Sequence, residues 1–224
     1  MNHAKAPGAK CNVCPLRQCD FVPPERNPSA LFAVVGDYPM AEEVRELRPF
    51  MGFGGQEITG AFRQAGIQRG GVHWTTSILC SPPEGRLDRF LHSIRKKNKK
   101  IEAENRTRKK EGSEPLPLIP SPQQCCAPRL HQELDGFHNL VVCGTTAAKA
   151  IIHSSASIMA LRGGPMELDR FNADGTHRAL RVLPTFHPAF VTKAKRWTAV
   201  FRQDIHRAVR WFTSGSLEWS PPEL

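Results

Sequence analysis

Residues 30–56, ALFAVVGDYPMAEEVRELRPFMGFGGQ, contain the pattern that decides the fold. Residues 30–35 are apolar and end at Gly36, which is typical of a strand buried on both faces of a parallel sheet. A loop with Asp37 follows, then a short predicted helix over residues 41–47 and a glycine-rich segment. Ligands of open α/β sheets bind at the carboxyl ends of the strands, so an acid placed there is positioned for chemistry. The competing interpretation is an ordinary strand–loop–helix connection whose glycines only form turns.

The rest of the chain alternates between strand-like and helix-like segments. Further strands are predicted at residues 72–79, 140–144 and 180–186, and helices at 56–66, 123–134, 145–152 and 197–212. Residues 161–176 indicate a hairpin-like excursion. This alternation predicts an α/β fold, a three-layer α/β/α sandwich with a central, mainly parallel four-stranded sheet. We expect one domain over residues 1–224, with flexible segments at 1–10 and 214–224.

Composition favours a nucleic-acid partner. The 224 residues include 31 Lys and Arg against 21 Asp and Glu, which gives a formal charge of +10 and a pI near 9.6. A surplus of this size favours a polyanionic ligand, nucleic acid above all. The apolar runs are too short to span a membrane, and the first ten residues lack the apolar core of a secretory signal. We therefore expect a cytoplasmic monomer without a membrane contact.

The most basic part of the chain is residues 86–110, inside an insertion that we place at 86–122. Leu87, Phe90, Leu91 and Ile94 have helical spacing, so we expect a helix that frays into a charged loop. One interpretation is an arm that contacts phosphates and makes binding depend strongly on salt. The other is a solvated surface excursion.

Seven cysteines in a cytosolic chain indicate a metal site or catalysis more than disulfides. Cys11 and Cys14 form a C-x2-C pair, a spacing that lets two thiolates reach one metal centre. Cys80 follows the second predicted strand, and Cys143, inside the third, is predicted to be a small buried apolar residue.

Six short motifs occur in a fixed order along residues 11–212. They are Cys11-Asn-Val-Cys14, Gly36-Asp-Tyr-Pro39, Arg48-Pro-Phe-Met-Gly52 with Gly55, Cys80-Ser-Pro-Pro83, Cys126-Ala-Pro-Arg-Leu130 and Phe186-His-Pro-Ala189. In this order they resemble the iron–sulfur branch of the uracil-DNA glycosylase superfamily (families 4 and 5 and their phage-type relatives). Each motif alone is weak, and the series together is specific.

The resemblance implies a structural [4Fe–4S] cluster away from the chemistry. Its ligands would be Cys11, Cys14, Cys80 and Cys126. Cys126 fits better than Cys125 because only Cys126 gives the C-x-P-x-L register, and Cys19 is a spare that could substitute. A zinc site with four cysteines is the alternative.

The chemistry implied by the resemblance is hydrolysis of the N-glycosidic bond of uracil or another deaminated base flipped out of DNA. His187 would hydrogen-bond the base carbonyl and stabilise the leaving anion. Asp37 would orient water or stabilise the cationic sugar. Phe50 would stack on the base in a pocket that also contains Gly36 and Thr76. The competing interpretations are a histidine before a turn proline, an Asx-type helix cap and a core aromatic.

The segment after the histidine is expected to be a loop that enters the minor groove, with Phe190 or Val191 as a wedge. The DNA-binding candidates are Pro188, Ala189, Phe190, Lys193, Lys195 and Arg196. The absence of a lysine nucleophile in the motifs favours a monofunctional enzyme.

Three positions depart from the family pattern. Thr76 stands where family 4 has an asparagine that reads the uracil edge, Met40 replaces a glycine, and Asp37 replaces the longer glutamate. A threonine has one donor and cannot make the paired contact of an amide. The departures keep a second hypothesis open, an iron–sulfur DNA-binding module of the same fold with little or no glycosylase activity. A zinc-stabilised nucleic-acid-binding domain is a third.

Overall fold

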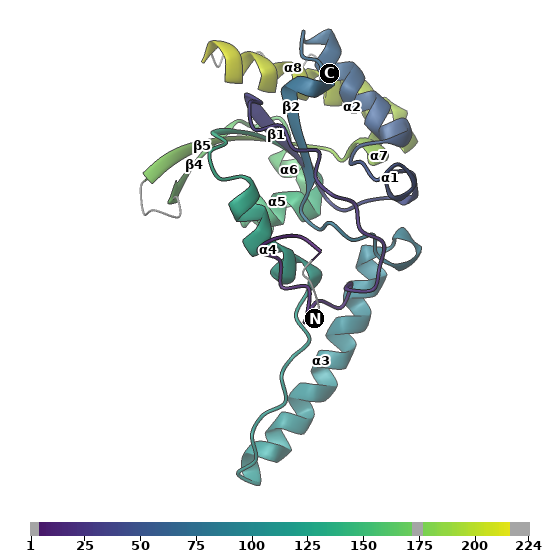
Figure 1. The fold of residues 1–224 in the computed structure, drawn as a ribbon, viewed down its shortest axis with the longest axis vertical. Helices are drawn as coiled ribbons and strands as arrows, with labels where there is room; N and C mark the ends of the chain where they lie inside the picture. The colour runs from purple at the N-terminus through teal and green to yellow at the C-terminus, as the bar shows by residue number, and fades with distance from the viewer. Residues whose placement is uncertain (1–4, 172–176, 216–224) are drawn as a thin grey trace.

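The computed structural model describes residues 5–171 and 177–215, and in it one five-stranded sheet organises the chain (Figure 1). The strand order is β2 (Val72–Thr76), β1 (Phe32–Gly36), β3 (Asn139–Cys143), β5 (His177–Thr185) and β4 (Met166–Phe171). The first four strands pair in parallel, and β4 pairs antiparallel with β5. The mainly parallel sheet is confirmed. The predicted count of four strands is wrong, because the hairpin-like excursion supplies β4 as a fifth, antiparallel strand at the edge.

The two faces of the sheet are covered by different helices, which confirms the three layers. Alternate residues of β1 point to opposite faces. Phe32 and Val34 pack with α2 (Gly52–Gln64), α7 (Pro188–Lys193) and α8 (Thr198–Ser214). Ala33 and Val35 pack with α4 (Pro122–Glu133) and α5 (Thr145–Ile152). The short helices α1 (Ala41–Glu46) and α6 (Ile158–Leu161) complete the connections, with 3-10 turns at Arg69–Gly71, Pro83–Gly85 and Lys195–Trp197.

Helix α2 begins at Gly52, earlier than the residue 56 start predicted from the sequence. The glycines of the motif form its first turn because other backbone approaches them closely. A Cβ on Gly54 would lie 3.0 Å from the backbone nitrogen of Ala189, and one on Gly55 would overlap the carbonyl of Phe50. The two glycines therefore allow α2 to pack against the start of α7 and against the loop before it.

Helix α3 (Leu87–Lys110) corrects the prediction that the basic insertion frays into a loop. It stays helical to Lys110 and projects away from the sheet, and the chain returns beside it toward α4 (Figure 1). Within the described ranges, no helix is long and apolar enough to cross a membrane.

The chain ends were expected to be flexible, and residues 1–4 and 216–224 lie outside the described residues. Residues 5–10 lie against α4 in the structure. Ala6 is buried, and the Lys10 backbone N–H donates to the carbonyl of Cys125 at 2.9 Å.

Candidate active site

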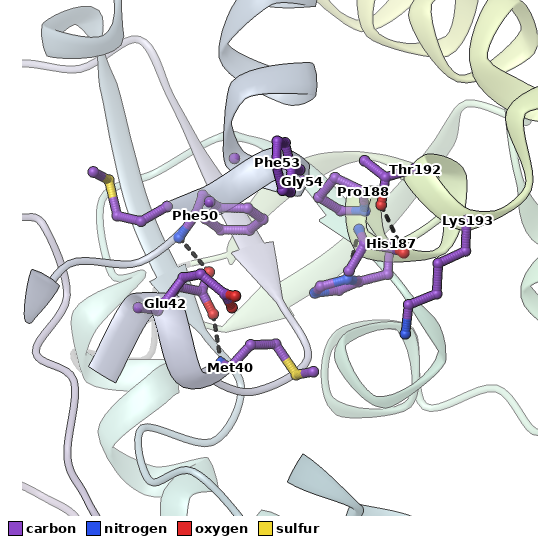
Figure 2. A pocket seen from close by; sticks show the side chains of 14 residues that line it. Met40, Glu42, Phe50, Phe53, Gly54, His187, Pro188, Thr192 and Lys193 are labelled. Atoms are coloured by element: carbon purple, nitrogen blue, oxygen red, sulfur yellow. Dashed lines mark hydrogen bonds between the residues drawn. The ribbon is translucent and has the colours of Figure 1, made fainter. Parts of the chain in front are cut away.

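A cavity of about 240 Å³ opens between three parts of the chain. They are the loop and helix α1 that follow β1, the start of α2, and the start of α7. Figure 2 shows Phe50 and His187 on opposite sides of this space, with Phe53 and Lys193 near its edge. The lining residues are Met40, Glu42, Glu43, Phe50, Met51, Gly52, Phe53, Gly54, Gly55, His187, Pro188, Ala189, Thr192 and Lys193. Two sequence-predicted site residues, Phe50 and His187, are therefore brought to one cavity.

Phe50 is held in an unusual backbone conformation. Its φ is +54°, in the left-handed region, and its ring rests on Gly36. A Cβ on Gly36 would lie 2.8 Å from the Phe50 Cζ. The ring also packs against Trp74, with 5.3 Å between the ring centroids, and is nearly parallel to His187 at 6.4 Å. Gly36 thus lies behind Phe50 and serves the pocket by giving the ring room.

Glu43 positions this loop, and the sequence analysis missed it. Its Oε1 accepts the Phe50 backbone N–H at 2.5 Å, and its Oε2 accepts that of Met40 at 2.6 Å. The side chain is buried, and burial raises its pKa to about 7, although the backbone N–H groups act in the opposite direction. The available signal was an acid three residues after the N-cap residue of a helix, where a carboxylate can accept backbone N–H groups.

His187 is the N-cap residue of α7, and the first turn of this helix fixes its side chain. Its Nδ1 accepts the Ala189 backbone N–H at 3.3 Å, so in the neutral ring the hydrogen resides on Nε2. Burial lowers the pKa of His187, while the nearby Asp37 carboxylate raises it by a smaller amount. The arrangement provides a neutral imidazole with one N–H available for donation at the cavity.

Asp37 lies beside His187 and caps α5 at the same time. Its Oδ1 accepts the Ala147 backbone N–H at 2.8 Å, and its carboxylate lies over Gly144, whose φ is +100°. Burial raises the pKa of Asp37, while His187 and the backbone N–H groups of Ala147 and Thr146 lower it. The carboxylate therefore has the helix-cap contacts of the competing interpretation and also an electrostatic interaction with the histidine. It does not line the cavity.

Thr76 is buried at the end of β2 and does not line the cavity either. Its hydroxyl donates to the carbonyl of Ile78 at 2.8 Å. The single hydrogen of this side chain is used within the protein, so the hydroxyl oxygen can only accept a further hydrogen bond.

The segment after His187 is the short helix α7 where a loop was predicted. Val191 is fully buried in the core, so the suggestion that it could be a wedge is wrong, whereas Phe190 is 43% exposed. Pro188, Ala189 and Lys193 line the cavity, and Lys195 and Arg196 lie in the exposed turn that follows.

Phe53 is a second residue that sequence analysis missed. Its side chain is 81% exposed in the first turn of α2, at the edge of the cavity (Figure 2). An aromatic residue within a glycine-rich motif was the available signal.

The four cysteines of the sequence motifs gather at one place, away from this cavity. Cys14, Cys80 and Cys126 belong to one buried cluster with Leu16, Ile78 and Leu87. The pKa of Cys80 is raised to about 12, chiefly by burial, with Lys5 acting in the opposite direction and the nearby thiols of Cys126, Cys14 and Cys11 adding to the rise. Cys125 is buried beside Cys14. Cys143 is fully buried in the third strand, as predicted.

Arg129 holds the cysteine-bearing helix α4 to the end of β2. Its guanidinium donates to the carbonyls of Thr76 and Ser77, at 2.8 and 3.1 Å, and to Glu133 at 2.8 Å. Glu133 also bonds His73 at 2.9 Å. These charge-assisted hydrogen bonds, made by both Nη atoms while the buried Nε has no partner among the described residues, fix the helix where Cys126 meets Cys80.

Among the described residues, no three or more His, Cys, Asp or Glu side chains converge closely enough to hold one metal ion. In a [4Fe–4S] cluster each thiolate binds a different iron, so the ligand sulfurs need not converge on a single point. Neighbouring thiols from three separate segments are the donor set that such a cluster uses.

Comparisons with known proteins agree with these features. The family described as "Uracil DNA glycosylase superfamily" matches residues 23–210. A Type-4 uracil-DNA glycosylase of Thermotoga maritima is 25% identical over 206 residues, which cover 89% of this chain and 88% of the relative. The enzyme of the same name from Pyrobaculum aerophilum is 37% identical over 78 residues, 34% of this chain and 40% of that protein. Because this family model covers residues 23–210, most of the sequence, the chain belongs to the uracil DNA glycosylase superfamily.

Proposed function

We propose that this protein is a monofunctional DNA glycosylase that hydrolyses the N-glycosidic bond of uracil, or of another deaminated base, flipped out of DNA. The observation that carries the proposal is the geometry of His187, which caps α7 through Nδ1 and lies opposite Phe50 in one cavity. The relatives named Type-4 uracil-DNA glycosylases support the choice of reaction.

His187 acts on the departing base. As the bond breaks, negative charge develops on the base carbonyl, and a donor fixed at that place stabilises the transition state. The Ala189 N–H holds Nδ1 as an acceptor, so the Nε2 hydrogen is the one donated. Phe50 supplies the face on which the base stacks.

Asp37 acts on the sugar side. Positive charge develops on the sugar as the base leaves, and a carboxylate nearby stabilises it and can orient the attacking water. The Ala147 N–H fixes the position of the carboxylate beside His187, just outside the cavity lining.

Thr76 lies outside the cavity lining and gives the base no specific contact. Because its hydroxyl already donates to Ile78, it offers the base no hydrogen. We therefore expect this enzyme to discriminate less strictly between uracil and other deaminated bases than an enzyme with an asparagine amide at this position.

DNA is held around the cavity mouth by groups of two kinds. Phe53 and Phe190 are exposed apolar side chains that can fill the space left by the flipped nucleotide. Lys193, Lys195 and Arg196 are exposed cations suited to phosphates.

A [4Fe–4S] cluster is held by Cys11, Cys14, Cys80 and Cys126 in this proposal. When bound it supplies iron–thiolate bonds that join the N-terminal segment, the end of β2 and the start of α4. The base-release step uses no group of the cluster.

Base release from labelled oligonucleotides containing uracil, hypoxanthine or xanthine tests the proposal. His187→Ala should lower the rate of release by about 10²- to 10³-fold, the usual effect of removing one such donor. Asp37→Asn should also lower it. His138→Ala, which changes an exposed histidine at the start of β3, is the control and should leave release unchanged. Release that is equal in all four proteins would contradict the proposal.

A second candidate is a DNA-binding module of the same fold with little or no glycosylase activity. The helix-cap contacts of Asp37 and the occupied hydroxyl of Thr76 favour it. The same assay identifies it, since the wild-type protein would then bind the oligonucleotides and release no base.

A further inference from the structure

Helix α3 has an inner side that is covered by its own chain. The inner positions recur every three or four residues, which is the spacing of one helix face. They are Leu87, Leu91, Ile94, Asn98, Ile101, Asn105 and Arg108, and each is buried or half-buried. Leu87 and Leu91 pack in the cysteine cluster, and farther along the helix the covering segment is residues 114–120, which we call the strap.

Two asparagines fasten the strap to the helix. The Asn98 amide donates to the Ile119 carbonyl and accepts the Ile119 N–H, both at 2.9 Å. Asn105 makes the same pair of bonds with Leu116, at 2.9 and 2.7 Å. Seven helical residues span about 10.5 Å, and three extended residues span about 10 Å, so the two spacings match.

The strap sequence suits this role. Pro115, Pro117 and Pro120 have no N–H and favour an extended chain, which leaves Leu116 and Ile119 free to donate to the asparagines. The strap and α3 thus form one pre-formed arm, and a helix with so many like charges is stabilised in the absence of a ligand.

The outer side of the arm is a positive stripe. It consists of Arg89, His92, Lys96, Lys99, Ala103, Arg106 and Lys110, which are all exposed and have the same alternating spacing as the inner face. No acidic residue interrupts it. In the part of the chain that the structure describes, Arg89 is the one member with an ion pair, to Glu84 at 3.2 Å. The other four cations, Lys96, Lys99, Arg106 and Lys110, have no ion-pair partner among the described residues.

The arm begins at the edge of the cavity. The Tyr38 hydroxyl donates to the carbonyl of Gly85 at 3.4 Å, and the terminal methyl of Met40, a cavity residue, lies against Gly85. From there α3 extends away from the sheet (Figure 1). The distance from Arg89 to Lys110 is about 30 Å at 1.5 Å per residue, close to one turn of duplex DNA.

We propose that the outer stripe of α3 binds the phosphate backbone of DNA on one side of the nucleotide held in the cavity. The inference rests on the proposed function for the identity of the ligand. A membrane surface fits less well, because a helix lying on lipid needs an exposed apolar face, and the inner side of α3 is covered by the cysteine cluster at its start and by the strap farther along. The arm would add sequence-independent affinity that weakens with salt.

The test compares two variants that each remove three positive charges. The arm variant is Lys99→Gln/Arg106→Gln/Lys110→Gln, at the stripe positions farthest from the cavity. The control variant is Arg26→Gln/Lys149→Gln/Arg210→Gln, at exposed sites outside the arm. Affinity is measured by fluorescence anisotropy over a range of salt concentrations. The duplexes are about one and about three helical turns long and carry one central deoxyuridine whose sugar is fluorinated to resist hydrolysis.

The arm variant should bind the long duplex more weakly than wild type, with a salt slope smaller by up to about 0.9 per lost phosphate contact. Its binding to the short duplex should be unchanged. The control variant should behave as wild type on both. Equal affinities and slopes for the arm variant and wild type would overturn the inference, as would equal losses in the arm and control variants.

Base release is measured separately, so the two proposals can fail independently. If wild type releases no base while the arm variant still loses affinity for the long duplex, the glycosylase proposal fails and the arm proposal stands. If release is normal and the arm variant binds as wild type does, only the arm proposal fails.

Discussion

At the scale of single residues, the close approach of Phe50 to Gly36 gives the sharpest prediction. Gly36→Ala would place a methyl group 2.8 Å from the Phe50 ring, and we expect overpacking to displace the ring and lower base release at least about tenfold. Gly60→Ala is the control, because Gly60 lies inside α2 with no atom within 4 Å of an added Cβ. It should keep full activity and gain about 0.5–1 kcal/mol of stability. Equal activity in both variants would show that the Phe50 position is unimportant.

Glu43 should make stability depend on pH. Its pKa is about 7 in the folded protein because of burial, and near 4.3 for an unfolded chain. The folded state therefore keeps a proton that the unfolded state loses between these values. The free energy of unfolding should fall as the pH rises from about 4.5 to about 7, by up to about 4 kcal/mol, and level off above.

Urea unfolding of wild type and Glu43→Gln at several pH values measures this effect. Asp37 and Asp204 also have raised pKa values, but both are present in the two proteins, so the difference between the proteins isolates Glu43. The variant should show a smaller fall with pH. Parallel curves for the two proteins would contradict the assignment.

The sequence identified His187 and Phe50 as cavity residues, yet it missed Glu43 and Phe53. A charged residue in the first turn of a helix is usually solvated, so nothing local indicated that the chain would fold over Glu43. Gly36 and Thr76 were placed in the pocket, and they lie behind its wall. Position along a strand can be read from a sequence, whereas which side chain covers which depends on tertiary packing.

At the scale of elements, α3 shows how a charge count can mislead. Fraying was expected because apolar residues with helical spacing were found only as far as Ile94, and a mostly charged stretch follows. The inner spacing continues to Arg108, but asparagines at two of its positions hide it from a search for apolar residues. The strap, which lies later in the chain, supplies the backbone partners of these asparagines. A search of local sequence patterns does not connect the helix with the strap.

The strap gives an element-level prediction. Asn98→Ala/Asn105→Ala should speed hydrogen exchange at the Leu116 and Ile119 amides by about tenfold or more, because their acceptors are removed. Thr107→Ala, on the outer side of the same helix, should leave these amides unchanged. Protection that survives in the double variant would mean that the strap is held by other contacts.

At the scale of the whole molecule, the cysteine site should decide whether distant segments stay together. Cys126→Ser should abolish the visible absorbance and the bound iron and sulfide, and lower stability, because three segments lose their common attachment. Cys19→Ser, at a half-buried cysteine outside the proposed ligand set, should retain both. If the wild-type protein is colourless and contains zinc, the cluster assignment is wrong and the four cysteines bind zinc.

The arm leaves the domain just after Cys80 and returns just before Cys126. Both ends are thus anchored beside the same buried site, and the strands and the cavity do not depend on what lies between. Such an arm can change length in evolution or by design without altering the enzyme body. The spacing of the two asparagines sets the step by which the length can change. Each step removes seven residues from the helix together with three from the strap, because only this ratio keeps the remaining asparagine side chain opposite its backbone partner.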